Sequence, residues 1–175
     1  MPVLKHKTPL LHKNLVNIQK GYTLIELLIG LSVIAIVFST GFVNFRDFSR
    51  RQALIGAARE ISGELRLAQE KALSGQKPDH LNCNTPNTLA GFNFRIDSPN
   101  SYVIEAVCSL GTVEVKSIEL VPSITISTPT PNPILFKVLG QGTNILSGES
   151  AVLTLTQTDL GNTLNVSIGA TGEIK

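Results

Sequence analysis

Hydrophobic positions are concentrated in one uninterrupted stretch near the start of this 175-residue chain. Residues 27–45 (LLIGLSVIAIVFSTGFVNF) contain no charged side chain, and Ile, Val and Phe surround the helix that they predict. These 19 residues, at about 1.5 Å each, would span roughly 28 Å, which is close to the hydrocarbon thickness of a bilayer. The pattern predicts a transmembrane helix over residues 22–45.

Two other kinds of segment share part of this pattern. A soluble core helix would have to be buried on every side, which a domain of this size achieves poorly. A secretory signal has a shorter apolar core that ends in a cleavage site of small residues. Residues 39–41 (STG) weakly resemble such a site, but the apolar run continues to Phe45, which favours a helix that is retained.

Beyond residue 45 the hydrophobic pattern becomes one-sided. Apolar residues recur at alternating spacings of four and three, typical of one helix face, at Leu54, Ala58, Ile61, Leu65, Ala68 and Ala72. Gly75 is a typical helix stop, and Pro78 follows three residues later. We therefore expect one helix over Thr23–Ser74, with its second half, within residues 46–75, packed on another layer.

After Gly75 the pattern changes from helical to alternating. Residues 79–91 (DHLNCNTPNTLAG) predict a polar loop, and Thr128–Pro133 predicts a second loop between strands. Seven half-buried antiparallel strands are predicted, at Phe92–Ile96, Tyr102–Cys108, Val113–Leu120, Ile124–Ser127, Ile134–Val138, Val152–Gln157 and Leu164–Ile168. The expected fold class is α+β, with the long N-terminal helix packed on an antiparallel β-sheet domain of residues 76–175.

Charge is distributed unevenly over these segments. Residues 1–21 carry four lysines and no acidic residue, while Arg46, Arg50 and Arg51 closely follow the apolar stretch. The distribution of Lys and Arg therefore favours a cytoplasmic N-terminus by a small margin. Residues 76–175 carry five basic and eight acidic residues, a net charge of 5 − 8 = −3. This balance argues against a nucleic-acid partner.

A single carboxylate lies beside the apolar stretch. An ionised Glu26 at the membrane edge is costly unless it is hydrated or paired, and residues 22–45 contain no Lys or Arg. Glu26 can lie at the level of the lipid headgroups, or it can pair with an α-amino group created by cutting the chain nearby. Tyr22 precedes it by four residues, which is one turn along the same helix face.

Residues 20–28 (KGYTLIELL) resemble the prepilin motif, in which Gly, an aromatic residue and Thr-Leu-Ile-Glu lead into a long apolar helix. The resemblance implies that a prepilin peptidase cuts after Gly21, removes the basic leader 1–21, and leaves Tyr22 as an N-methylated first residue. Tyr22 departs from the commoner Phe but is a flat ring of similar size. In such proteins the carboxylate corresponding to Glu26 would pair with a neighbouring subunit's amine and set the register of assembly.

The C-terminal part resembles the GspH/FimT family of minor pseudopilins, through residues 171–174 (TGEI) and the stretch 136–140. This resemblance implies a structural subunit of a type II secretion pseudopilus or a type IV pilus. The implied partners are the prepilin peptidase, other pilin or pseudopilin subunits, the inner-membrane assembly platform and, before assembly, membrane lipid. The implied location is the cytoplasmic membrane, with the N-terminus cytoplasmic and the β domain outside.

Two other functions stay open at this point. A DNA-binding minor pilin is known for some members of the subgroup, but it would need a basic patch. A bitopic membrane enzyme would need an active site, and no GxSxG, HExxH or Walker A motif is present. We expect no enzymatic activity, no cofactor and no metal site, and we expect the strand carboxylates Glu105, Glu114 and Glu119 to lie on solvated faces.

Cys83 and Cys108 both follow the apolar stretch. If that part of the chain lies outside the cytoplasm, oxidation is permitted and we expect the two cysteines to be bonded. The alternative is two unpaired cysteines acting as small apolar side chains. The distance between their Cα atoms decides, because a disulfide requires less than about 7 Å.

Overall fold

The computed structural model describes residues 21–175, apart from the side chains of residues 40–44. The predicted leader therefore lies outside the described residues, except for Gly21. The chain divides into two compact units, with the boundary between Phe42 and Val43. The fold confirms an α+β protein, with one long N-terminal helix packed on antiparallel sheets.

The helix α1 (Leu24–Ser74) ends where the sequence predicts, at a left-handed glycine. Gly75 has a φ of +63°, and its N–H donates to Ala72 O, while Gln76 N–H donates to Lys71 O. This pair of bonds is a Schellman motif, which satisfies carbonyls that the helix end would leave unpaired. Lys71 in the last turn also complements the negative end of the helix dipole.

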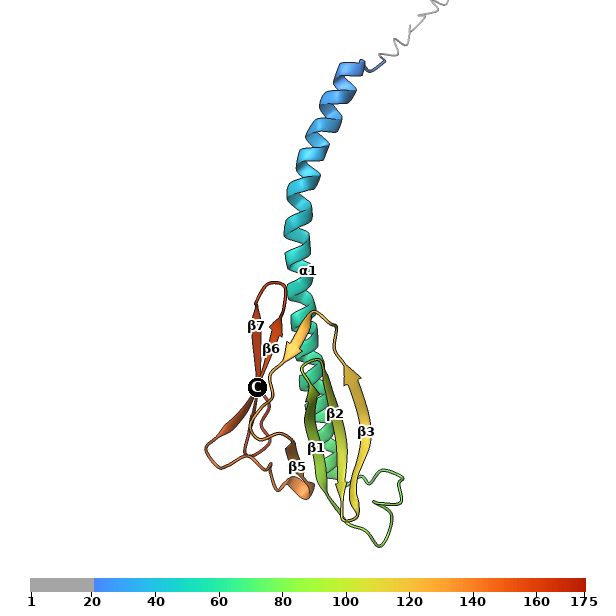
Figure 1. Ribbon diagram of the computed structural model, residues 1–175, viewed down its shortest axis with the longest axis vertical. Helices are drawn as coiled ribbons and strands as arrows, with labels where there is room; N and C mark the ends of the chain where they lie inside the picture. The colour runs from blue at the N-terminus through green and yellow to red at the C-terminus, as the bar shows by residue number, and fades with distance from the viewer. Residues whose placement is uncertain (1–20) are drawn as a thin grey trace, which may run out of the picture. The chain divides into compact units, whose positions relative to one another are not determined.

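Seven strands form two antiparallel sheets in the unit of residues 43–175. The first sheet has the order β3-β2-β1-β5, with β1 (Leu89–Ser98), β2 (Ser101–Cys108), β3 (Gly111–Glu119) and β5 (Ile134–Lys137). The second has the order β4-β6-β7, with β4 (Ile124–Ile126), β6 (Ser150–Gln157) and β7 (Thr163–Gly169). A short 3-10 turn, η1 (Val138–Gly140), follows β5. Figure 1 shows β1, β2 and β3 lying along the second half of α1.

One hydrophobic core joins α1 to both sheets. The apolar stripe predicted on α1 is buried at Leu54, Ile61, Leu65, Ala68 and Ala72, with Ala58 half-buried. The sheets contribute large side chains that are at most 2% exposed, among them Phe92, Phe94, Tyr102, Phe136, Leu153 and Ile168. The rings of Phe94 and Tyr102 lie 5.0 Å apart. Burial of this stripe supplies the packing that holds a helix on a sheet.

All seven predicted strands are present, but β1 starts three residues earlier than expected. The predicted loop 79–91 is shorter because Leu89 already pairs with Cys108. Gly91 allows this extension, since a Cβ atom there would lie 2.1 Å from Phe136 O on β5. The backbone of β5 approaches β1 so closely at Gly91 that a residue with a side chain would not fit there.

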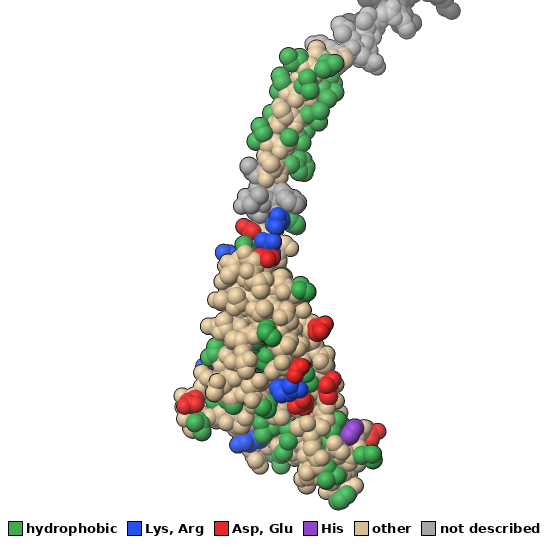
Figure 2. Space-filling view, in the orientation of Figure 1, with side chains coloured by type: hydrophobic (Ala, Val, Ile, Leu, Met, Phe, Trp, Pro, Cys, Tyr) green, Lys and Arg blue, Asp and Glu red, His purple; other side chains and the backbone are tan. Residues whose placement is uncertain are grey.

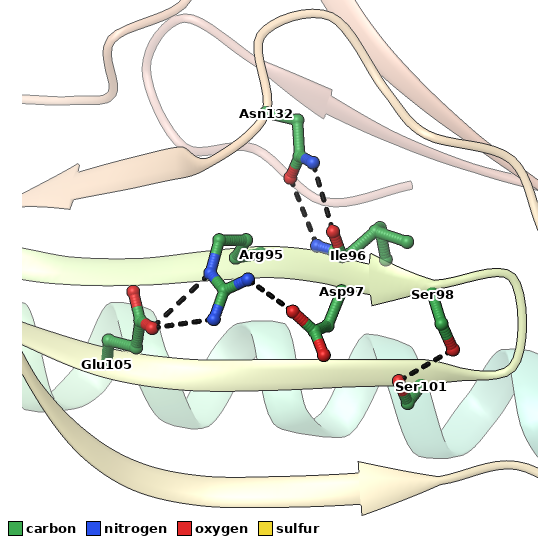
Figure 3. Close-up of polar contacts among 7 residues, drawn as sticks. All are labelled: Arg95, Ile96, Asp97, Ser98, Ser101, Glu105 and Asn132. Atoms are coloured by element: carbon green, nitrogen blue, oxygen red, sulfur yellow. Dashed lines mark hydrogen bonds and ion pairs between the residues drawn. The ribbon is translucent and has the colours of Figure 1, made fainter.

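The Pro-rich segment 128–133 connects β4 of one sheet with β5 of the other. The backbone pairing of β1 with β5 ends at Ile134, and prolines flank Asn132 on both sides. The side chain of Asn132 continues the pairing instead. Its Oδ1 accepts from Ile96 N–H at 3.0 Å, and its Nδ2 donates to Ile96 O at 3.1 Å (Figure 3). The amide thus replaces the backbone groups of an ordinary strand residue.

Candidate functional site: the N-terminal segment

The peptide bond between Gly21 and Tyr22 lies in an exposed, non-helical segment just before α1. A Cβ atom added at Gly21 would have no heavy atom within 4 Å, and the Tyr22 side chain is 83% exposed. Proteases cut backbone that is accessible and free of regular structure. The predicted cleavage bond therefore lies where an enzyme can reach it without unfolding α1.

Thr23 caps the N-terminus of α1, a role that our sequence interpretation did not assign to it, although it started the helix at this residue. Its Oγ1 accepts a hydrogen bond from Glu26 N–H at 3.3 Å, and its carbonyl accepts from Leu27 N–H. A Thr followed three residues later by Glu is the sequence signature of a capping box, so the spacing could have shown this. Glu26 also lies in the first turn, where a negative charge is favourable to the helix dipole.

Glu26 therefore has a local structural role as well as the one proposed for it in assembly. Its side chain makes no ion pair within the described part of the chain. A partner cation for this carboxylate must come from elsewhere, such as another subunit or a new chain terminus. The capping role and the assembly role differ in whether they need the charge of Glu26. A capping box tolerates a neutral Gln at this position, whereas an ion pair requires the carboxylate.

The first half of α1 exposes hydrophobic side chains in all directions. Eleven apolar residues between Leu24 and Phe38 are each more than half exposed, and Figure 2 shows hydrophobic side chains along this segment. The hydroxyls of Ser32 and Ser39 donate hydrogen bonds to Ile29 O and Ile36 O, both at 2.8 Å. Neither serine therefore leaves an unpaired hydrogen-bond donor on this apolar surface. Such a surface is stable only when other apolar groups cover it.

No helix in the described part of the chain is both long enough and apolar enough to cross a membrane. The span predicted over residues 22–45 is not confirmed and stays a prediction.

A network of ions on β1 and β2 is the most polar cluster in the β domain. Arg95 donates from Nη2 to Glu105 Oε1 at 2.9 Å and from Nη1 to Asp97 Oδ1 (Figure 3). The hydrogen bond with Glu105, followed by that with Asp97, raises the pKa of Arg95. Glu105 was expected on a solvated face, but its side chain is only 14% exposed, because it lies against this guanidinium. Arg95 pairs with both carboxylates across β1 and β2, which indicates a structural role.

A second polar cluster connects α1 to the first sheet. Lys116 of β3 forms an ion pair with Glu64 of α1, and the hydroxyl of Tyr102 is buried without a hydrogen-bond partner among the described residues. Burial, and then the charges of Glu60 and Glu64, raise the pKa of Tyr102. The phenol therefore stays protonated at neutral pH and does not supply a nucleophilic oxygen there.

Cys83 and Cys108 are joined by a disulfide, with 5.3 Å between their Cα atoms. The bond connects the loop after α1 to the end of β2. No group of three or more His, Cys, Asp or Glu side chains in the described residues is placed to hold a metal ion.

An accessible bond after Gly21 followed by a capped apolar helix is the arrangement that the prepilin motif predicts. Residues 16–42 match the family model described as the prokaryotic N-terminal methylation motif. The match supports a type IV pilin-like, prepilin-type protein, a class that a prepilin peptidase processes and that assembles with other pilins. Neither a curated protein nor a solved structure matches the chain.

Proposed function

We propose that this chain is a minor pilin or pseudopilin of the GspH/FimT type, a structural subunit of a type IV pilus or type II secretion pseudopilus. The observation that carries this proposal is the N-terminal segment, in which an accessible Gly21–Tyr22 bond precedes a capped helix with an apolar surface. In this proposal the helix is held in the cytoplasmic membrane before assembly and packs among other subunits afterwards. The assembly platform of the membrane is then a further partner.

The β domain supports the choice of subgroup through its C-terminal turn. Gln69 of α1 donates from Nε2 to Gly172 O at 3.0 Å, and Gly172 has a φ of +90°, which favours glycine. Residues 173–175 then pair with β7, through Gly169 N–H to Glu173 O and two bonds between Ser167 and Lys175. The Thr-Gly-Glu-Ile motif thus fastens the end of the chain to both the helix and the second sheet.

Processing by a prepilin peptidase is expected to produce a mature chain that begins at Tyr22 and carries one added methyl group. Intact-mass spectrometry after co-expression with a prepilin peptidase measures this. Gly21→Val is expected to block cleavage, and because the site has open space, the variant leaves the folded residues undisturbed. Gly30→Ala, also in open space, is the matched control and should be cleaved normally. An uncleaved wild-type chain, or a first residue other than Tyr22, would contradict the proposal.

Both Glu26→Ala and Glu26→Gln are expected to reduce incorporation into filaments by roughly tenfold or more, on the scale of one charged hydrogen bond. The physical reason is that each variant removes the carboxylate that would pair with a neighbouring subunit's amine. Co-purification of the tagged chain with partner pilins measures incorporation, and intact mass verifies that cleavage still occurs. If Glu26→Gln assembled like the wild type, the charge of Glu26 would have no role in assembly, and the residue would only lie at the membrane interface.

A further inference from the structure

A groove of about 460 Å³ runs between one flank of α1 and β7. Its α1 wall contains Ile55, Ala58 and Gly63, and its β7 wall contains Leu164 and Val166. These residues give the groove an apolar floor, and the small side chains of Ala58 and Gly63 leave space beside α1. A neighbouring hollow shares Ile55 and Leu164 with the groove and continues it along α1 to Arg51. A further hollow shares Arg51 with that neighbour but no residue with the groove itself.

The groove is strongly basic although the domain as a whole is acidic. Arg59, Arg66 and Lys175 line it, and no Asp or Glu does. Neither Arg59 nor Arg66 has an ion-pair partner within the described part of the chain, whereas Lys175 pairs with Glu173 at 3.2 Å. The two unpaired arginines lie beside the same groove, so an anionic occupant would be stabilised here.

β7 offers this groove an unpaired strand edge. It is the last strand of its sheet, and residues 173–175 cover its outer edge only as far as Ser167, which exchanges both backbone hydrogen bonds with Lys175. Since hydrogen-bonding directions alternate along a strand, the backbone groups of Asn165 and Thr163 face the same outer side. The pairing already formed by residues 173–175 shows that this edge accepts a strand.

The other long edges are protected. Asn144 covers β5, because its Oδ1 accepts from Leu135 N–H, its Nδ2 donates to Pro133 O, and its N–H donates to Leu135 O. β3 carries Glu114, Lys116 and Glu119 along its length, and charged edges discourage pairing. Unlike the edges of β5 and β3, the edge of β7 is open, and it lies beside an apolar floor and two unpaired arginines.

We propose that this groove docks an extended acidic segment of a partner protein, which adds to β7 as a further strand. Backbone hydrogen bonds to Asn165 would fix the segment, its apolar side chains would cover Ile55 and Leu164, and its carboxylates would pair with Arg59 and Arg66. An unpaired strand edge and an apolar floor match a peptide, whereas a phosphate backbone would use neither. The groove lies within residues 43–175, so this docking does not depend on cleavage at Gly21.

The test uses the full chain in detergent and two peptides that carry fluorescein on the N-terminal amine, Glu-Val-Glu-Val-Glu-Val-amide and its counterpart with Lys in place of Glu. Fluorescence anisotropy is expected to show that the acidic peptide binds at least tenfold more tightly. Arg59→Glu/Arg66→Glu should weaken its binding by tenfold or more. Lys71→Glu/Lys77→Glu, which makes the same change in net charge outside the groove, should leave binding unchanged.

A second pair of variants tests the strand edge separately from charge. Asn165→Pro removes the outward N–H and should weaken binding of the acidic peptide about tenfold, whereas Asn165→Ala keeps that N–H and should bind normally. If Asn165→Pro fails to fold, hydrogen exchange of the wild type decides, because the peptide should slow exchange at the Asn165 amide. Three results would overturn the proposal: equal binding of both peptides, preferential binding of a 20-base-pair DNA duplex, or a self-association lost in Arg59→Glu/Arg66→Glu without peptide binding.

Discussion

Leu65→Ala is expected to lower the free energy of unfolding by about 2–5 kcal/mol, the usual cost of truncating a fully buried Leu. Leu65 is 0% exposed on the face of α1 that packs in the core. The neighbouring core side chains are large and closely packed, so the structure can collapse only partly around the missing atoms. Urea denaturation followed by circular dichroism, with the chain in detergent, measures the change.

Leu67→Ala on the same helix is the matched control. Leu67 is 38% exposed, so the same chemical change should alter the free energy of unfolding by no more than about 0.5 kcal/mol. Equal losses in the two variants would mean that α1 does not pack on the sheets through the Leu54–Ala72 stripe. Such a result would contradict the helix-on-sheet core described above, and this conclusion does not depend on the function of the chain.

Removal of the Cys83–Cys108 disulfide is expected to destabilise the β domain by about 3 kcal/mol, the chain-entropy estimate for a sequence separation of 25. The bond holds the loop 79–88 against the end of β2. Without it, most of the loop keeps local bonds, such as Cys83 N–H to His80 O and Asn87 N–H to Asn84 O, and only Thr88 at its end stays bonded to Ser109 after β2. Cys83→Ala/Cys108→Ala is the appropriate variant, because a single substitution would leave a reactive thiol.

A reductant provides the internal control for this second prediction. It should destabilise the wild type about as much as the double substitution does, and it should have no effect on Cys83→Ala/Cys108→Ala. Urea denaturation with and without reductant gives all four values. Labelling of both thiols in the non-reduced wild type would show that the cysteines are not bonded in solution.

The sequence predicted most of the secondary structure because the relevant signals are local. A helix face follows from the spacing of Leu54, Ile61 and Leu65, and its end follows from Gly75, which adopts a left-handed φ. Alternation at Leu153 and Leu155 correctly predicted a half-buried strand. At the candidate site, the run from Gly21 to Glu26 predicts a cleavage bond and a carboxylate that acts in assembly, and both stay predictions. The structure adds that the Gly21–Tyr22 bond is exposed and that Thr23 caps the helix.

The tertiary structure decided what depends on residues far apart in the sequence. It divided the seven strands into two sheets, placed the partly buried Glu105 against Arg95, and extended β1 through Gly91 because β5 approaches closely there. Such pairings are set by which elements share a core, and no local pattern encodes them. The basic groove is the clearest case: the net charge of residues 76–175 is negative, but folding places α1's arginines beside the open edge of β7, more than 90 residues away.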